Sequence, residues 1–327
     1  MKIARAAAAL LVVLSSAAWP ATHTIEACTF PGGFNWPFWV ASEKGFFAAE
    51  GLEVKLTPAT GSVMQIRGLA EGKFDIAIST IDNVVAYDEG QGEAKLAATP
   101  DFFAFMGAQY GAVRLVSQPD IQAIGQLKGK SLAVDAATTG YAFVLRKLLQ
   151  HGGLAESDYS LEPLGGTAQR AEALMQGRTS ATILTSPLEV VPESRGYRRL
   201  ANAVDVVGPY QALTGIAKRS WARDNADSLV AFIRAYRKAL DWLGDPSHRG
   251  EAIAIYRAHL PQANDEIAGK AWDALLAGPE GFQKTARLDR AGIETAIALR
   301  KEFARPSVPL GAADKYIDES YYLKATQ

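Results

Sequence analysis

The feature that most constrains the fold is an internal repeat at an offset of 105 residues. Segment 54–80 aligns without a gap on segment 159–185, and seven of the 27 positions are identical. The identical pairs are Leu56/Leu161, Pro58/Pro163, Gly61/Gly166, Leu69/Leu174, Gly72/Gly177, Ile78/Ile183 and Thr80/Thr185. Two copies of one segment predict two similar folding units within the chain.

Both copies carry the same order of structural signals. In the first copy an expected strand at 52–57 leads to Gly61-Ser62, where the hydroxyl can begin a helix. This helix ends at Gly72, and a buried strand at 74–79 follows. The second copy repeats the pattern 105 residues later. Strands that alternate with helices predict parallel sheets flanked by helices.

A further strand and helix precede each copy. We expect a strand at 24–30 before a helix at 38–49, and a strand at 131–135 before a helix at 141–151. In open α/β sheets, ligands bind beyond the carboxyl ends of the strands. The expected fold is therefore α/β with two lobes, each a mainly parallel sheet flanked by helices, with a ligand cleft between them.

The lobes are expected to be discontinuous in the sequence. A chain of 327 residues exceeds the usual size of one hydrophobic core. We expect crossings between lobes within 104–116 and 202–216, so that lobe 1 comprises 19–109 plus 208–327 and lobe 2 comprises 110–207. Apolar residues at helical spacing predict further helices near 226–243, 250–259, 265–276 and 289–303.

Residues 1–18 have the pattern of an export signal. Lys2 and Arg5 precede an apolar run at 6–13, and small residues follow at 15–18. The run is too short to cross a bilayer as a helix. We expect an exported, soluble, periplasmic protein; the alternative is an ordinary N-terminal helix.

Charge and composition disfavour several classes of function. The chain has 34 basic and 35 acidic residues, and it has no basic stripe suited to nucleic acid. Its single cysteine, Cys28, is expected to be buried on the first strand, and its four histidines lack metal-ligand spacing. No metal or cofactor is expected. With no G-x-S-x-G motif, an enzyme is also disfavoured.

Four segments resemble a known family. They are 39–54 (WVASEKGFFAAEGLEV), 69–79 (LAEGKFDIAIS), 165–174 (GGTAQRAEAL) and 221–236 (WARDNADSLVAFIRAY). They are similar to the periplasmic receptors for nitrate, bicarbonate, sulfonates, taurine and thiamine precursors that serve ABC importers. The resemblance implies a type II periplasmic-binding fold, a small-molecule ligand, ABC permease subunits as partners, a monomer and no covalent chemistry.

The aromatic loop after the first strand is the first candidate for ligand contact. Asn35 and Trp36 should overhang the cleft, whereas Phe38 and Trp39 are expected to face the core of the following helix. The alternative is that the whole aromatic group is core. If Trp36 contacts ligand, Trp36→Ala should reduce affinity much more than stability.

Hydroxyls and glycines at expected helix starts form the second group of candidates. Backbone N–H groups at such positions suit an anionic oxygen. The alternative is that each hydroxyl only caps its own helix. The candidates are Thr60, Gly61, Ser62, Ser79, Thr80, Asn83, Thr138, Thr139, Gly140, Gly166 and Thr167.

Three further side chains complete the expected site. Tyr141 could close over a ligand, Thr185 lies at a strand end, and Glu189 would favour a ligand with an amine or amide. Arg170 is expected to be a scaffold residue.

The expected function is that of a receptor that closes on a small organic anion, a carboxylate or sulfonate, and delivers it to an ABC importer. Alternatives are a receptor for a pyrimidine-type thiamine precursor and a sensor that feeds a membrane signalling protein.

Overall fold

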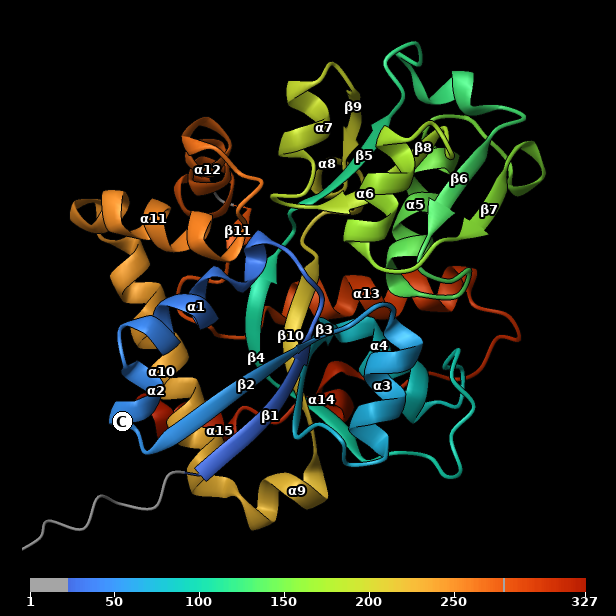
Figure 1. The fold of residues 1–327 in the computed structure, drawn as a ribbon. Coiled ribbons are helices and arrows are strands. Elements are labelled where there is room, and N and C mark those ends of the chain that lie inside the picture. Colours follow the sequence, from blue (N-terminus) through green and yellow to red (C-terminus); the bar gives the residue numbers. More distant parts are fainter. Residues whose placement is uncertain (1–22, 279) are drawn as a thin grey trace, which may run out of the picture.

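Two β-sheets, each covered by helices, form the chain (Figure 1). The computed structural model describes residues 23–278 and 280–327, so the expected export signal at 1–18 lies outside the described residues. The first sheet has six strands in the order β11-β4-β10-β3-β1-β2, and the second has five in the order β7-β6-β8-β5-β9. The six-stranded half and the five-stranded half are named here after these sheets.

The strands of the first sheet are β1 (His23–Thr29), β2 (Leu52–Pro58), β3 (Ile76–Thr80), β4 (Phe102–Tyr110), β10 (Gln211–Lys218) and β11 (Gly281–Phe282). Those of the second are β5 (Val113–Ser117), β6 (Ser131–Val134), β7 (Ser160–Pro163), β8 (Ala181–Thr185) and β9 (Arg198–Asn202). The second sheet thus comes from one continuous stretch of chain. The chain passes between sheets at 110–113 and 202–211, within the expected crossings.

The helices up to the second crossing are α1 (Trp36–Glu43), α2 (Phe46–Ala49), α3 (Ser62–Ala70), α4 (Ile81–Asp88), α5 (Gly140–His151), α6 (Thr167–Met175), α7 (Val190–Ser194) and α8 (Val204–Val207). Those after it are α9 (Arg219–Asp224), α10 (Ala226–Gly244), α11 (Arg249–His259), α12 (Asp265–Trp272), α13 (Arg290–Phe303), α14 (Ala313–Tyr316) and α15 (Ser320–Ala325). Short 3₁₀ turns lie at Gly33–Asn35, Ile124–Leu127, Glu156–Asp158 and Pro246–His248, and a π-helical turn at Asp273–Ala277. No helix in the described part of the chain is both long enough and apolar enough to span a bilayer.

The internal repeat is visible as repeated structure. Shifting α3 and β3 by 105 residues reproduces the bounds of α6 and β8. In both halves the strand before the repeated helix pairs in parallel with its neighbour, β2 with β1 and β7 with β6. The prediction of two similar strand–helix units is confirmed.

The sheets are mixed rather than mainly parallel, which corrects one detail of the expected fold. The pairs β1–β2, β1–β3, β6–β7 and β6–β8 are parallel. The strands next to the crossings, however, pair antiparallel: β10 with β3 and β4, and β5 with β8 and β9. These strands belong to neither copy of the repeat; they carry the chain between sheets, so the repeat could not predict their direction.

The hydrophobic core is continuous between the two halves on one side. Helix α10 buries the face predicted from its spacing, including Leu229, Ile233 and Tyr236, against α1 and α15. Helix α13 instead packs against both α4 and α5. There Phe143 of α5 stacks on Phe303 of α13, with ring centroids 6.3 Å apart. The shared core joins the two halves along this side.

Candidate functional site

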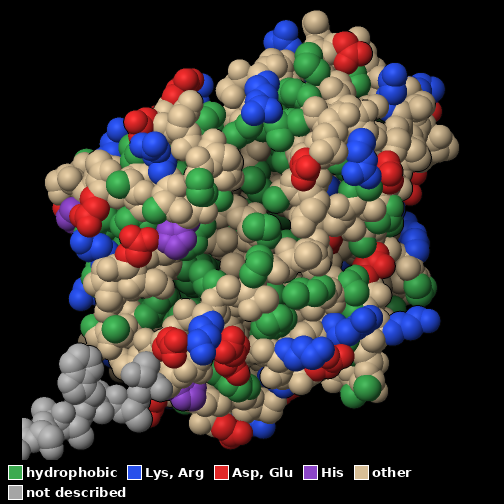
Figure 2. All heavy atoms as spheres, in the orientation of Figure 1, with side chains coloured by type: hydrophobic (Ala, Val, Ile, Leu, Met, Phe, Trp, Pro, Cys, Tyr) green, Lys and Arg blue, Asp and Glu red, His purple; other side chains and the backbone are tan. Residues whose placement is uncertain are grey.

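A pocket with an empty volume of about 450 Å³ lies between the two halves. Both halves contribute to its walls, at the carboxyl ends of β1, β3, β6 and β8 and at the first turns of α3, α4, α5 and α6. Charged side chains lie mainly toward the rim of the face shown in Figure 2, and uncharged ones occupy its middle. The lining residues are Phe30, Phe34, Ser62, Ser79, Thr80, Asn83, Asp135, Thr139, Tyr141, Gly166, Thr167, Arg170, Thr185 and Leu213.

The pocket brings together nine of the sixteen residues expected to bind ligand. They are Ser62, Ser79, Thr80, Asn83, Thr139, Tyr141, Gly166, Thr167 and Thr185. They come from both copies of the repeat, from α4 directly after the first copy and from the helix start before the second copy. Their role in binding stays a prediction, because lining a pocket does not by itself show contact with a ligand.

The hydroxyls at these helix starts do not cap the helices. None of α3, α4, α5 and α6 has a side-chain N-cap hydrogen bond. Thr139 Oγ1 donates to the carbonyl of Ala136 at 3.0 Å, and Ser79 Oγ accepts from Asn83 Nδ2 at 2.8 Å. The alternative that these hydroxyls only cap their helices is therefore wrong.

Arg170 supplies a buried positive charge at the pocket wall. It is 2% exposed. Its guanidinium donates to Gly165 O at 2.7 Å, Thr167 Oγ1 at 3.2 Å, Thr182 Oγ1 at 3.2 Å and Ile183 O at 3.1 Å. Burial lowers the pKa of Arg170 from its ordinary value. Its bonds join the start of α6 to β8, as a scaffold residue would, and they also hold the cation still beside the pocket.

Asp135, which follows β6, connects the two halves across the pocket. Its carboxylate accepts from the backbone N–H of Ser62, the first residue of α3, with an Oδ2–N distance of 3.2 Å. A carboxylate at a helix N-terminus is electrostatically favourable. A second contact between the halves lies nearby, where Gly166 N–H donates to Thr60 O at 3.1 Å. These two contacts hold the start of α3 against the five-stranded half and the start of α6 against the six-stranded half.

Two pocket hydroxyls lie near each other and have no well-formed hydrogen bond to any residue that the structure describes. They are Tyr141 Oη and Thr185 Oγ1, and both atoms are buried. Burial raises the pKa of Tyr141 to about 12, an effect that the nearby Thr185 hydroxyl partly offsets. The Tyr141 phenol is therefore neutral at physiological pH and can donate a hydrogen bond.

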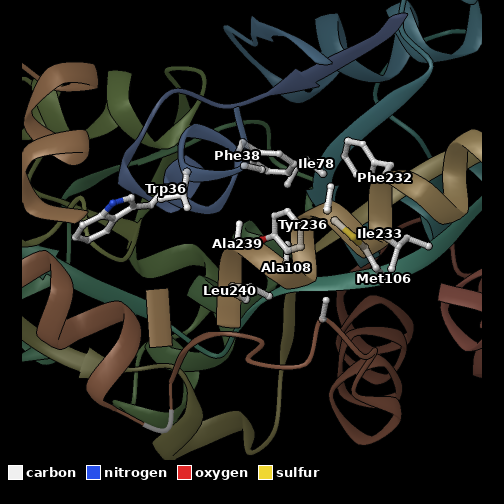
Figure 3. Packing of buried hydrophobic residues seen from close by; sticks show 14 of the residues in the cluster. Trp36, Phe38, Ile78, Met106, Ala108, Phe232, Ile233, Tyr236, Ala239 and Leu240 are labelled. Atoms are coloured by element: carbon white, nitrogen blue, oxygen red, sulfur yellow. The ribbon is translucent and has the colours of Figure 1, made fainter. Parts of the chain in front are cut away.

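Trp36 lies in the core, which corrects the expectation that it overhangs the cleft (Figure 3). It is 0% exposed, and its Nε1–H donates to Ala252 O at 3.0 Å. Its ring lies 4.5 Å from that of Tyr256 and 5.7 Å from that of Trp272. Since the partners come from α11 and α12, more than 200 residues along the chain, local sequence could not reveal them.

Asn35 is also absent from the pocket wall. Its Oδ1 accepts from Thr29 Oγ1 at 2.7 Å, and its Nδ2 donates to Phe30 O at 2.7 Å. Both amide groups are thereby used within the loop. Asn35 thus fixes the segment that places Phe30 at the pocket, rather than reaching a ligand itself.

Four other expected residues lie at contacts between the halves and do not line the pocket. Thr60 accepts from Gly166, as described above, and a Cβ on Gly61 would meet Asp135 Oδ1 at 3.2 Å. Thr138 binds the Glu93 carboxylate through its N–H and its hydroxyl, at 3.0 and 2.6 Å. Gly140 packs so closely on Asp82 that a Cβ there would lie 2.5 Å from the Asp82 Cβ.

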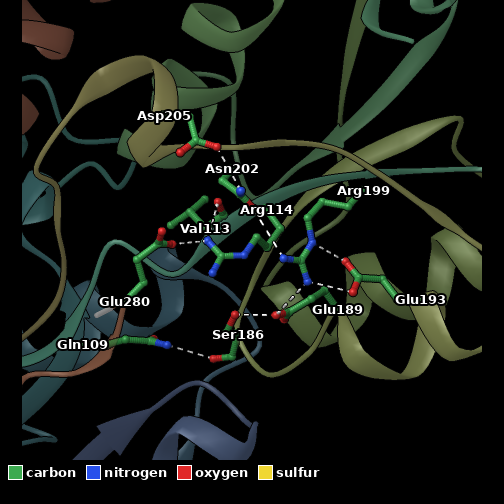
Figure 4. Close-up of polar contacts among 10 residues, drawn as sticks. All are labelled: Gln109, Val113, Arg114, Ser186, Glu189, Glu193, Arg199, Asn202, Asp205 and Glu280. Carbon is green, nitrogen blue, oxygen red and sulfur yellow. Dashed lines mark hydrogen bonds and ion pairs between the residues drawn. The ribbon is translucent and has the colours of Figure 1, made fainter. Parts of the chain in front are cut away.

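Glu189 lies in a separate polar network where the chain crosses between the sheets (Figure 4). It is 1% exposed, its Oε1 accepts from Ser186 Oγ, and its Oε2 has no partner among the residues that the structure describes. Burial raises its pKa, while Ser186 and the charge of Arg114 oppose the rise. Arg199 lies 3.9 Å from Oε1 but is paired mainly with Glu193. The network links the crossing segments; Glu189 is not part of the pocket, contrary to expectation.

The sequence reasoning missed four lining residues: Phe30, Phe34, Asp135 and Leu213. Phe30 and Asp135 could have been found, because each directly follows a strand, where side chains reach the cleft. Leu213 lies within the antiparallel strand β10, whose place in the sheet no sequence signal indicated.

The comparisons with known proteins agree with this architecture. The model of the family described as NMT1/THI5 like matches residues 35–248. YtlA of Bacillus subtilis, named as a binding protein, is 27% identical over 231 residues, covering 68% of this chain and 66% of its own length. The formylaminopyrimidine-binding protein of Halalkalibacterium halodurans is 21% identical over 250 residues, which cover 75% of this chain and 73% of that protein.

Solved structures confirm the two-lobed fold class. The periplasmic nitrate-binding protein NrtA from Synechocystis PCC 6803 superposes with a TM-score of 0.76 at 14% identity, covering 93% of this chain and 88% of that chain. The desulfurization enzyme DSZB has the fold as well, with a TM-score of 0.61 at 15% identity over 93% of this chain and 99% of that chain. At these identities the likeness concerns fold alone. Because the family model covers well over half of the residues, the chain belongs to the NMT1/THI5-like family.

Proposed function

We propose that this chain is the solute-binding receptor of an ABC importer and that it captures a small organic anion, a carboxylate or a sulfonate. The observation that carries the proposal is the pocket between the halves, whose walls are rich in hydroxyl groups and include the first turns of α3, α4, α5 and α6. Donors of this kind, with the fixed Arg170 cation beside them, favour an acidic group.

The apolar part of the pocket supports an organic solute over a small inorganic oxyanion. Phe30, Phe34 and Leu213 line it, and all three come from the six-stranded half. Aromatic side chains bind apolar or planar ligand bodies, with a few polar groups fixing the orientation.

The proposal extends to the working cycle. Lobe 1 (19–109 plus 208–327) and lobe 2 (110–207) close by a hinge motion around the ligand, as is usual for this architecture. The receptor is exported, works as a soluble periplasmic monomer and presents the closed form to the permease subunits.

A pyrimidine-type thiamine precursor is the second candidate ligand. Asp135 favours it, because a carboxylate in the pocket wall can accept from a ring amine. The relative that binds formylaminopyrimidine points the same way.

Isothermal titration calorimetry tests the proposal. The purified protein is titrated with benzoate, 1-butanesulfonate, formylaminopyrimidine and nitrate. Saturable binding of benzoate or butanesulfonate, without chemical change of the solute, is expected. Binding of formylaminopyrimidine alone would select the second candidate, and binding of nitrate alone would reject an organic ligand.

A further inference from the structure

Tyr141 and Thr185 stand out in the pocket because their buried hydroxyls lie near each other and make no well-formed hydrogen bond to any described residue. Buried polar groups in folded proteins almost always have a partner, and exceptions call for an explanation. Thr185 is 1% exposed and ends β8, while Tyr141 lies in the first turn of α5. The two side chains come from separate elements of the five-stranded half and meet at the same wall.

The surroundings of this pair favour an acceptor group with negative charge. Arg170 lines the same pocket as this pair, and its positive charge acts to lower the pKa of Tyr141. Its hydrogen bonds to Gly165, Thr167, Thr182 and Ile183 prevent it from turning toward either hydroxyl. Arg170 therefore supplies a fixed positive potential, whereas the hydroxyls remain free to donate.

The opposite wall is less suited to an acidic group. There the N-terminus of α3 already binds the Asp135 carboxylate through Ser62 N–H. A second anion at that position would be repelled by Asp135. The same half supplies Phe30, Phe34 and Leu213, which suit an apolar body.

We propose that the hydroxyls of Tyr141 and Thr185 together bind the acidic group of the ligand, so that each donates to an oxygen of the carboxylate or sulfonate. The inference rests on the proposed function and deepens it by fixing the ligand's orientation: the acidic group lies on the five-stranded half and the apolar body on the six-stranded half.

The test compares near-isosteric variants. Tyr141→Phe and Thr185→Val remove one hydroxyl each, and calorimetry measures their affinity for benzoate and 1-butanesulfonate. Each variant is expected to bind roughly 10-fold or more weakly, because a hydrogen bond to a charged group is lost. Their melting temperatures without ligand should fall little, since neither hydroxyl makes a well-formed hydrogen bond to the described residues.

Tyr236→Phe is the matched control. The Tyr236 hydroxyl is also buried and without a partner, but it lies in the core beside Phe38 rather than at the pocket. Its removal should leave both affinities unchanged. Benzyl alcohol, which lacks the acidic group, is a second control: the preference of the wild type for benzoate over benzyl alcohol should shrink in Tyr141→Phe.

The outcomes separate the two proposals. Wild-type affinity in both Tyr141→Phe and Thr185→Val, with a native melting temperature, would overturn the inference and leave the proposed function standing. Failure of the wild type to bind either benzoate or 1-butanesulfonate would overturn the organic-anion proposal and the inference with it.

Discussion

The backbone N–H of Ser62 and the carboxylate of Asp135 meet at 3.2 Å across the pocket, although the two residues are 73 positions apart. Ser62 begins α3 on the six-stranded half, and Asp135 follows β6 on the five-stranded half. Closing the pocket therefore provides an anion for a helix N-terminus that no side chain of its own half caps.

Removing this carboxylate should favour a more open molecule. Asp135→Ala deletes the acceptor, and we expect the contact to contribute about 1–2 kcal/mol to closure. Small-angle X-ray scattering should show a larger radius of gyration than for the wild type. Asp120→Ala, an exposed change in the same half, is the control. An unchanged radius of gyration in Asp135→Ala would show that this contact does not hold the halves together.

Trp36 is predicted to support stability rather than affinity. Trp36→Ala removes a fully buried ring packed against Tyr256 and Trp272, which should lower the free energy of unfolding by about 3–5 kcal/mol. Urea denaturation measures this loss. Trp221→Ala, on the partly exposed α9, should lower the free energy of unfolding much less. A normal stability with impaired binding would return Trp36 to the ligand site.

Glu189 should make stability depend on pH. Because burial raises its pKa, the folded state keeps this proton to a higher pH than the unfolded state does. The resulting stabilisation is present in acid and is lost as the pH rises from the pKa of an ordinary glutamate through the raised value. Glu189→Gln stays neutral and can still accept from Ser186.

Melting temperatures of the wild type and of Glu189→Gln at pH 4 and pH 7 measure this effect. The melting temperature of Glu189→Gln relative to that of the wild type should increase as the pH rises. Ser186, Arg114, Arg199 and Glu193 surround the group, and all remain in the variant. Glu172→Gln, exposed on α6, controls for loss of one carboxylate. A difference that stays constant with pH would mean that Glu189 has the same pKa in the folded and unfolded states.

The buried pair of Asp82 and Arg300 should be sensitive to loss of one partner. The two side chains are each 1% exposed, and Arg300 donates to both Asp82 oxygens at 2.7 Å and to Thr138 O at 2.9 Å. Asp82→Asn leaves a buried cation without its counter-charge, which should cost about 3–5 kcal/mol of unfolding free energy.

Two variants make the measurement for this pair decisive. Lys147→Ala breaks the more exposed ion pair between Lys147 and Glu302, which also joins α5 to α13, and should cost far less. The double variant Asp82→Leu/Arg300→Leu should recover part of the loss, since an apolar pair leaves no buried charge. Equal losses of unfolding free energy for Asp82→Asn and Lys147→Ala, measured by chemical denaturation, would refute the prediction that the buried pair is the more sensitive one.

The repeat made much of the fold predictable. Offsets between identical residues marked the bounds of α3 and α6 and of β3 and β8, because glycines and hydroxyls that start and end helices are local signals. The directions of β5 and β10 were beyond reach, since strand pairing across a crossing depends on contacts distant in the sequence.

The site was predictable in part for the same reason. Ser62 and Thr167 lie at helix starts that the repeat identified, and both line the pocket. Trp36 shows what the sequence could not predict. Its position after β1 places it at one end of the sheet, but contacts with α11 and α12, distant in the sequence, turn its ring into the core. Asp135 was missed because it counted as the last residue of a strand.

The five-stranded sheet comes from one uninterrupted stretch of chain, while the six-stranded sheet is assembled from the segments on either side of it. The stretch from β5 to β9 can therefore be exchanged as a single cassette. Grafting the corresponding segment of a relative would replace Asp135, Tyr141, Arg170 and Thr185 in one step and leave the wall with Phe30 and Phe34 intact. Recombination of genes at two joints is enough to give such a receptor a new combination of walls, and with it a new solute.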